Sequence, residues 1–219
     1  MNRMHFFAHR GDNKNHQENT LLAFESSLHK GFRAFELDLR RTADDHVVLF
    51  HDDTLERHGR PDLNAGELTL EEFRELVPSL TTFHDLRAYF ARMGVTINLE
   101  IKDGPETLQR ILPHLGDFRR VVISSFDHRV VDLAVEAGLE AGYLMETLEE
   151  PAGRFMNTRL HVPFQGSDED FRTLEKLRDY QVYCYTVNRP ETAVRLMQYG
   201  QVHGIFTDNR DLPKQCLYG

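Results

Sequence analysis

The sequence predicts an α/β protein whose fold is a single (β/α)₈ TIM barrel, with an antiparallel hairpin arm after the second strand. Three observations lead to this prediction. Apolar runs alternate with helical patterns, glycines that can end helices stand just before several of these runs, and the runs that can form parallel strands number eight. A chain of 219 residues is within what one such barrel occupies, so we expect one domain over residues 1–219.

The first strand and helix are expected within the first 31 residues. Residues 4–8 form an apolar run that predicts a strand ending at His9. Asn19 or Thr20 can cap the helix that follows, because both side chains can accept a hydrogen bond from a free backbone N–H. Gly31 supplies the left-handed stop.

The second strand is expected at residues 34–39, where apolar and acidic side chains alternate. A strand places Glu36 and Asp38 on one face and the apolar residues on the other. If helices cover the apolar face, both carboxylates point into the barrel. A solvent-exposed edge strand has the same pattern, and it remains the alternative at this point.

Residues 47–50 are apolar but lie too close to be the next parallel strand. A parallel crossover needs about a dozen residues or more, and the linker over residues 40–46 is shorter. We therefore predict an antiparallel hairpin with its turn at residues 43–45. Its return arm would bring His51 beside the two carboxylates of the second strand.

The remaining chain repeats strand and helix without a linker rich in proline, glycine or serine. Residues 52–66 are polar and predict a surface loop. Helices are expected over residues 69–76, 82–93, 130–137 and 171–180. The further parallel strands are expected at residues 95–101, 121–125, 141–145, 160–164, 182–187 and 204–207.

Composition limits the classes of partner. The formal net charge of −9 argues against nucleic acid or an anionic membrane, because both favour a basic surface. No apolar run is long enough to span a bilayer, and the first residues lack the apolar core of a signal peptide. We therefore expect a small-molecule ligand, no stable membrane insertion and a cytoplasmic location. The sequence leaves open whether the protein is a monomer or a homodimer.

A cluster of charged residues is expected at the carboxyl end of the barrel, where such folds carry their sites. Glu36, Asp38 and Glu100 would meet there. Three carboxylates without a thiolate suit Mg²⁺, Ca²⁺ or Mn²⁺ better than Zn²⁺. Packed together they would repel one another without a cation, so we predict one bound divalent cation.

Two cations and two histidines complete the predicted site. Arg10 and Lys102 are suited to binding phosphate oxygens. His9 and His51 can divide the proton transfers of a phosphate displacement, although the sequence does not show which is the base. Each residue taken alone is more often structural, and the prediction depends on all of them lying at one end of one barrel.

Several motifs along nearly the whole chain resemble the glycerophosphodiester phosphodiesterase family. In chain order they are His9-Arg10-Gly11, Glu18-Asn19-Thr20, Glu36-Leu37-Asp38, His51-Asp52, Leu99-Glu100-Ile101-Lys102, Ser125-Phe126, Thr186-Val187-Asn188 and Gly204-Ile205-Phe206-Thr207-Asp208. The resemblance implies a barrel enzyme that hydrolyses glycerophosphodiesters to glycerol 3-phosphate and an alcohol with a divalent cation.

The resemblance also implies residue roles. Glu36, Asp38 and Glu100 match the family's metal ligands, His9 and His51 its acid–base pair, and Arg10 and Lys102 its phosphate-contacting residues. Glu18 and Asn188 fall on motif positions, and we assign them no role.

The sequence departs from the family pattern in the loop over residues 12–17, at Tyr185 and at His203, which leaves the alcohol group of the substrate open. Two other functions are considered. One is a cyclising phosphodiesterase, in which a substrate hydroxyl attacks its own phosphate. The other is a barrel that binds sugar phosphates without turnover.

Overall fold

Eight parallel strands close into a barrel in the computed structural model, which describes residues 4–91, 93–151 and 159–218. The barrel strands are β1 (His5–His9), β2 (Ala34–Arg41), β6 (Thr96–Ile101), β7 (Arg120–Ser125), β8 (Glu140–Leu144), β9 (Arg159–Pro163), β10 (Gln181–Tyr185) and β11 (Val202–Thr207). The first strand, β1, pairs with both β2 and β11, which closes the sheet. The predicted (β/α)₈ barrel is confirmed, with strand bounds that differ from those expected by a residue or two.

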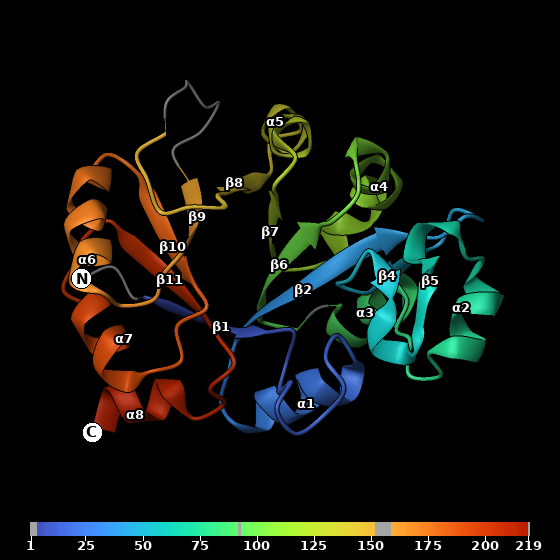
Figure 1. Cartoon of the computed structure of the whole chain (residues 1–219), viewed down its shortest axis with the longest axis horizontal. Helices are drawn as coiled ribbons and strands as arrows, with labels where there is room; N and C mark the ends of the chain where they lie inside the picture. Colours follow the sequence, from blue (N-terminus) through green and yellow to red (C-terminus); the bar gives the residue numbers. More distant parts are fainter. Residues whose placement is uncertain (1–3, 92, 152–158, 219) are drawn as a thin grey trace.

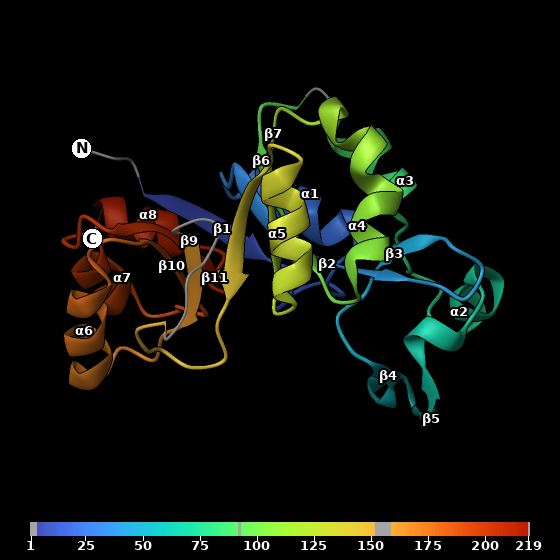
Figure 2. The ribbon, with the colours of Figure 1, turned by 90° about the horizontal axis from the view of Figure 1, so that it is seen from above.

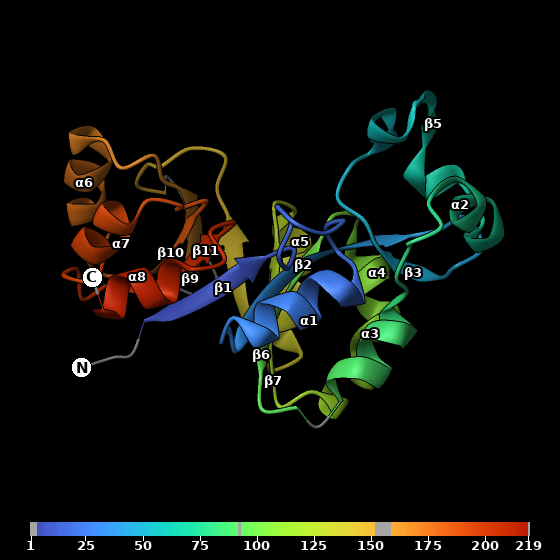
Figure 3. The same cartoon turned by 90° about the horizontal axis from the view of Figure 1, so that it is seen from below.

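The helices that surround the barrel are α1 (Leu21–His29), α3 (Phe83–Phe90), α4 (Pro105–Ile111), α5 (His128–Glu136), α6 (Asp168–Leu174), α7 (Pro190–Leu196) and α8 (Leu212–Tyr218) (Figure 1). Helix α2 (Leu70–Leu76) lies apart from them, beside the segment over residues 54–64. Figures 2 and 3 show α6, α7 and α8 on one side of the molecule and α3, α4 and α5 on the other. None of the described helices is long and apolar enough to cross a membrane.

Caps explain where several helices begin and end. Of the two candidates for α1, Thr20 is the N-cap, and its hydroxyl accepts a hydrogen bond from the Ala23 N–H at 3.3 Å. Capping boxes begin α2 and α3. The helix expected over residues 82–93 ends at Phe90, and residue 92 lies outside the described part of the chain. The helix expected over residues 171–180 instead begins at Asp168 and passes into the 3₁₀ turn η4 (Glu175–Leu177).

The predicted hairpin arm is present as β3 (Val47–Leu49), antiparallel to β2. The turn lies where it was expected: the Asp45 N–H donates to the Thr42 carbonyl at 3.1 Å. At the other end of β3, the Phe50 N–H donates to the Asp38 carbonyl at 3.2 Å. This bond continues the β2–β3 pairing to the residue just before His51.

The loop expected over residues 52–66 is wrong in part, because it contains a small antiparallel hairpin. The hairpin is formed by β4 (Thr54–Leu55) and β5 (Arg60–Asn64), with the 3₁₀ turn η1 (Glu56–His58) between them and η2 (Ala65–Glu67) after them. It packs over a separate apolar cluster that includes Leu55, Phe73 and Val77. The strands are short and mostly polar, so they carry no apolar alternation by which the sequence could predict them.

The second strand lies inside the sheet, between β1 and β6, and is not an edge strand. Phe35, Leu37 and Leu39 are fully buried in the main apolar core. The Phe35 ring packs against rings from α1 and α3, with Phe24 and Phe90 at 6.0 and 5.1 Å between centroids. Because the apolar face of β2 meets these helices, its acidic face turns into the barrel.

Candidate active site

Three carboxylates from two adjacent strands meet inside the barrel. Glu36 and Asp38 come from β2 and Glu100 from β6, where Asp38 and Glu100 are paired in register. One oxygen from each residue lies within 4.8 Å of the others. Glu36 and Asp38 are almost wholly buried, at 3% and 0% exposure. The three side chains that the sequence places together are therefore brought together.

Burial sets the protonation of this cluster. Burial, together with the charge of Asp38, raises the pKa of Glu36 to about 8. Burial and Asp38 also raise the pKa of Glu100. Burial acts in the same direction on Asp38, but nearby Arg10, His51 and Lys102 outweigh it and lower the pKa of that carboxyl. The arrangement favours Asp38 as the charged member in the absence of a further cation.

The donor set fits a divalent metal ion. Two buried carboxylate oxygens, Glu36 Oε1 and Asp38 Oδ1, have no hydrogen-bond donor among the described residues. A buried acceptor without a partner costs about 1–3 kcal/mol, so these oxygens favour a ligand. Carboxylate oxygens at this spacing are the ligands of hard cations such as Mg²⁺, Ca²⁺ and Mn²⁺.

Arg10 and Lys102 lie against the same carboxylates. Arg10 Nε is 3.1 Å from Asp38 Oδ2, and the Arg10 backbone N–H donates to Glu36 Oε2 at 3.1 Å. Lys102 Nζ donates to Glu100 Oε1 at 2.6 Å and lies 3.9 Å from Asp38 Oδ1. Although burial lowers it, the pKa of Lys102 is raised overall by Glu100 and Asp38, so the ammonium stays charged.

His9 lies at the end of β1, between a carboxylate of the cluster and the carboxylate that directly follows the last strand, β11. Its Nε2 is 3.8 Å from Glu36 Oε2, and its Nδ1 is 2.8 Å from Asp208 Oδ1. Burial lowers the pKa of His9, but Glu36 and Asp208 outweigh it and raise the pKa above the usual value. Asp208 is itself bonded by Asn13 Nδ2 at 2.5 Å.

A chain of hydrogen bonds and ion pairs holds His51. Its Nδ1 is 2.7 Å from Asp52 Oδ1. Arg57, from η1 of the small hairpin, bonds through Nε to Asp52 and through Nη2 to Glu18 Oε1 at 2.6 Å. Glu18 in turn lies 3.4 Å from Arg10 Nη1. Ion pairs thus link the surroundings of His51 to Arg10.

One cavity of about 240 Å³ lies over this site. Its lining includes six titratable residues of the predicted site, which are His9, Arg10, Glu36, His51, Glu100 and Lys102. The other part of its wall includes the apolar and aromatic residues Phe126, Leu144, Tyr185 and Phe206. Such a cavity can bind an anionic group on one side and a carbon skeleton on the other.

Three residues that support the site were not among the site residues predicted from the sequence. Asn19 donates to Asp38 Oδ2 at 2.9 Å and accepts from the Asp38 N–H at 3.2 Å. Site residues of such barrels lie at the carboxyl ends of the strands. Asp208 directly follows a predicted strand, so its position could have been identified from the sequence. Arg57 had no local signal, because its contacts depend on the fold of the small hairpin.

A closed parallel barrel with carboxylates, basic residues and histidines gathered in one cavity defines a class: TIM-barrel proteins suited to acting on phosphate esters. The family model described as "Glycerophosphoryl diester phosphodiesterase family" matches residues 9–212 of the chain. The chain belongs to this family, and the enzyme class expected from the sequence is confirmed.

Relatives match over almost their whole length. A glycerophosphodiester phosphodiesterase of Caldanaerobacter subterraneus subsp. tengcongensis is 30% identical, with 92% of this chain and 93% of the relative covered. One of Bacillus altitudinis is 28% identical, with 94% of each chain covered.

Solved structures show the same fold. The glycerophosphodiester phosphodiesterase of Thermotoga maritima has a TM-score of 0.82 at 26% identity, covering 98% of this chain and 99% of its own. An Oleispira antarctica phosphodiesterase, solved in complex with the product sn-glycerol-3-phosphate, has a TM-score of 0.79 at 21% identity, with 96% of each chain covered. The second likeness, at this identity, concerns the fold alone.

Proposed function

We propose that this protein hydrolyses glycerophosphodiesters to glycerol 3-phosphate and an alcohol with the help of one divalent cation. The observation that carries the proposal is the shared cavity: six of the seven site residues expected from the sequence line it, and the seventh, Asp38, lies buried beside Glu36 and Glu100. Membership of the family supports the same reaction.

Glu36, Asp38 and Glu100 would hold the cation. When bound there, a divalent ion polarises the phosphoryl group and offsets the charge that develops on its oxygens. Arg10 and Lys102 orient the phosphate, the arginine through two N–H groups and the lysine as a point charge. With a cation bound to the carboxylates, Arg10 and Lys102 would be able to leave Asp38 and Glu100 and bind the phosphate instead.

His9 and His51 transfer the protons. Each Nδ1 lies beside a carboxylate, Asp208 for His9 and Asp52 for His51, at 2.8 and 2.7 Å. A histidine bonded in this way keeps its ring orientation and leaves Nε2 for the substrate. One Nε2 takes the proton of the attacking water, and the other gives a proton to the leaving alkoxide.

The proposal is tested by analysing the products released from glycerophosphocholine and glycerophosphoethanolamine. We expect glycerol 3-phosphate to form directly, and we expect His51→Ala to lower its release by about 100-fold or more because a proton donor or acceptor is lost. His58→Ala, in η1 of the small hairpin, is the matched control. A cyclic phosphate as the first product would favour the cyclising reaction instead. Binding of the diesters without any turnover would favour a non-catalytic barrel.

A further inference from the structure

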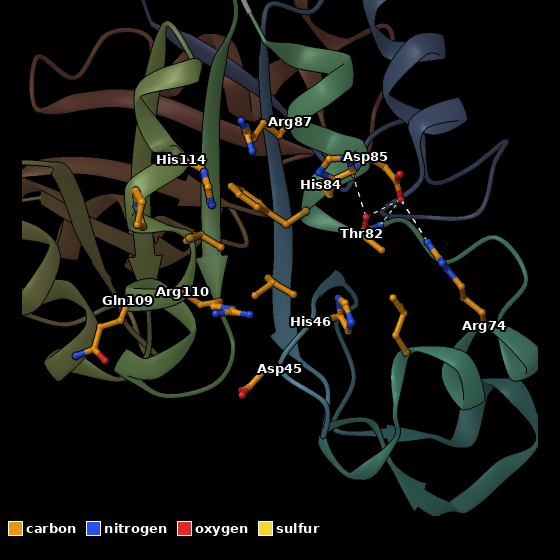
Figure 4. A pocket seen from close by; sticks show the side chains of 15 residues that line it. Asp45, His46, Arg74, Thr82, His84, Asp85, Arg87, Gln109, Arg110 and His114 are labelled. Carbon is orange, nitrogen blue, oxygen red and sulfur yellow. Dashed lines mark hydrogen bonds and ion pairs between the residues drawn. The ribbon is translucent and has the colours of Figure 1, made fainter.

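A second cavity, of about 710 Å³, lies outside the barrel between the hairpin turn and helices α2, α3 and α4 (Figure 4). It does not share a lining residue with the cavity over the carboxylate cluster. Its basic lining residues are His46, Arg74, His84, Arg87, Arg110 and His114. These side chains come from separate segments of the chain, so the fold gathers them. Such a group of basic side chains, three of them arginines, is notable in a chain with a formal net charge of −9.

Several side-chain donors of this groove have no hydrogen-bond or ion-pair partner among the residues that the structure describes. They belong to Arg110, His84 and His114, although His84 lies close enough to Asp85 to help lower the pKa of that carboxyl. Arg74 lies 3.8 Å from Asp85, and Arg87 pairs with Asp117. Arg110 is therefore the arginine of the groove whose guanidinium is free to bind an external anion.

The acidic residues of the groove are already engaged. Asp85 accepts hydrogen bonds from the Thr82 N–H at 3.0 Å and from the Thr82 hydroxyl at 2.6 Å, as the N-terminal capping box of α3. Asp45 pairs with Arg41 at 2.6 Å. Both carboxylates thus have partners other than Arg110, and they leave its charge uncompensated.

The floor of the groove is apolar. Val47, Phe83 and Ile111 line it and are 7%, 6% and 1% exposed. Figure 4 shows the Arg110 guanidinium turned towards His46. A ligand that fits this arrangement has an anionic group for the basic rim and an apolar or aromatic part for the floor.

We propose that this groove is a second binding site, for a small phosphate monoester with an apolar or aromatic substituent. Arg110 binds two phosphate oxygens through its planar guanidinium, and His46 donates a further hydrogen bond. The substituent packs on Val47 and Phe83. Val47 belongs to β3, the same arm that leads to His51, so an occupant of the groove contacts an element of the catalytic site.

The probe for the test is phenyl phosphate, a monoester that the proposed diesterase reaction does not consume. Histidine ring signals are followed by NMR while phenyl phosphate is added to the full chain. We expect saturable shifts of the His46, His84 and His114 signals. Inorganic phosphate should bind more weakly than phenyl phosphate, because it lacks the apolar part. Because no turnover is measured, failure of the proposed diesterase reaction would not affect this result.

Two variants make the test specific. Arg110→Gln should weaken binding by about tenfold or more, because the bidentate contact is lost. Arg129→Gln removes the same charge from an exposed site on α5 and should leave binding unchanged. Both arginines are exposed, so neither substitution affects the core. Absence of shifts at these histidines, equal binding by Arg110→Gln, or equal loss in both variants would overturn the proposal.

Discussion

Asp208 Oδ1 lies 2.8 Å from His9 Nδ1, so the residue after the last barrel strand holds the histidine at the end of the first. The two residues are far apart in sequence, and they meet because β1 and β11 are neighbours in the closed sheet. Closure of the barrel is therefore a condition for the geometry of His9.

Asp208→Asn is expected to lower kcat by about 10- to 100-fold, as loss of a carboxylate that orients a site histidine does. Because Asp208 helps to raise the pKa of His9, the substitution should also shift to lower pH the part of the pH profile of kcat that depends on His9. The pH profile of kcat checks both effects. An unchanged profile with full activity would show that the pair has no part in the reaction.

Arg57→Ala is expected to lower kcat by about tenfold with little change in KM, because Asp52 loses the partner that fixes it beside His51. Arg57→Lys should restore part of the rate. The matched control is Arg60→Ala in the same hairpin, where the arginine pairs with the exposed Asp62. An equal loss in Arg60→Ala would mean that the hairpin, and not the ion pair, is what matters.

Acid stability should depend on Glu140 at the amino-terminal end of the barrel. Hydrogen bonds from Arg120, together with Arg159, lower the pKa of Glu140 to about 2, although burial acts against this. The unfolded chain has a glutamate pKa of about 4.3, so the unfolded state binds more protons between these values. The stabilising contribution is thus present above about pH 4.3 and is lost as the pH falls towards 2.

Glu140→Gln should therefore lower the free energy of unfolding at neutral pH and make it less dependent on pH in the acid range. Urea unfolding at several pH values from about 3 to 6 measures this. Glu136→Gln, on the exposed face of α5, is the control. The account of Glu140 fails if both variants keep the pH dependence of the unaltered protein.

Much of the fold could be predicted because its signals are local. Buried strands appear as apolar runs. The alternation of apolar and acidic residues around Glu36 and Asp38 indicates a strand with one face on the core and the other inside the barrel. The position of His51 followed from a linker too short for a parallel crossover. Both features depend only on residues close in sequence and on the geometry of a strand.

The remainder depends on contacts between distant segments. The small hairpin has polar strands of two and five residues, so no apolar pattern marks it. Arg57 reaches Glu18 only once that hairpin is folded. The choice between Asn19 and Thr20 as helix cap was open because both residue types cap helices, whereas the structure uses Asn19 to bind Asp38.

The most direct test counts the bound cation and the product on the same samples. Protein stripped with EDTA is resupplied with Mn²⁺, bound Mn²⁺ is measured by electron paramagnetic resonance, and glycerol 3-phosphate release is followed. We expect about one Mn²⁺ per chain, release only with the ion, and loss of both in Asp38→Asn. Full release by the stripped protein, or by Asp38→Asn without bound Mn²⁺, would contradict the proposed role of the cation.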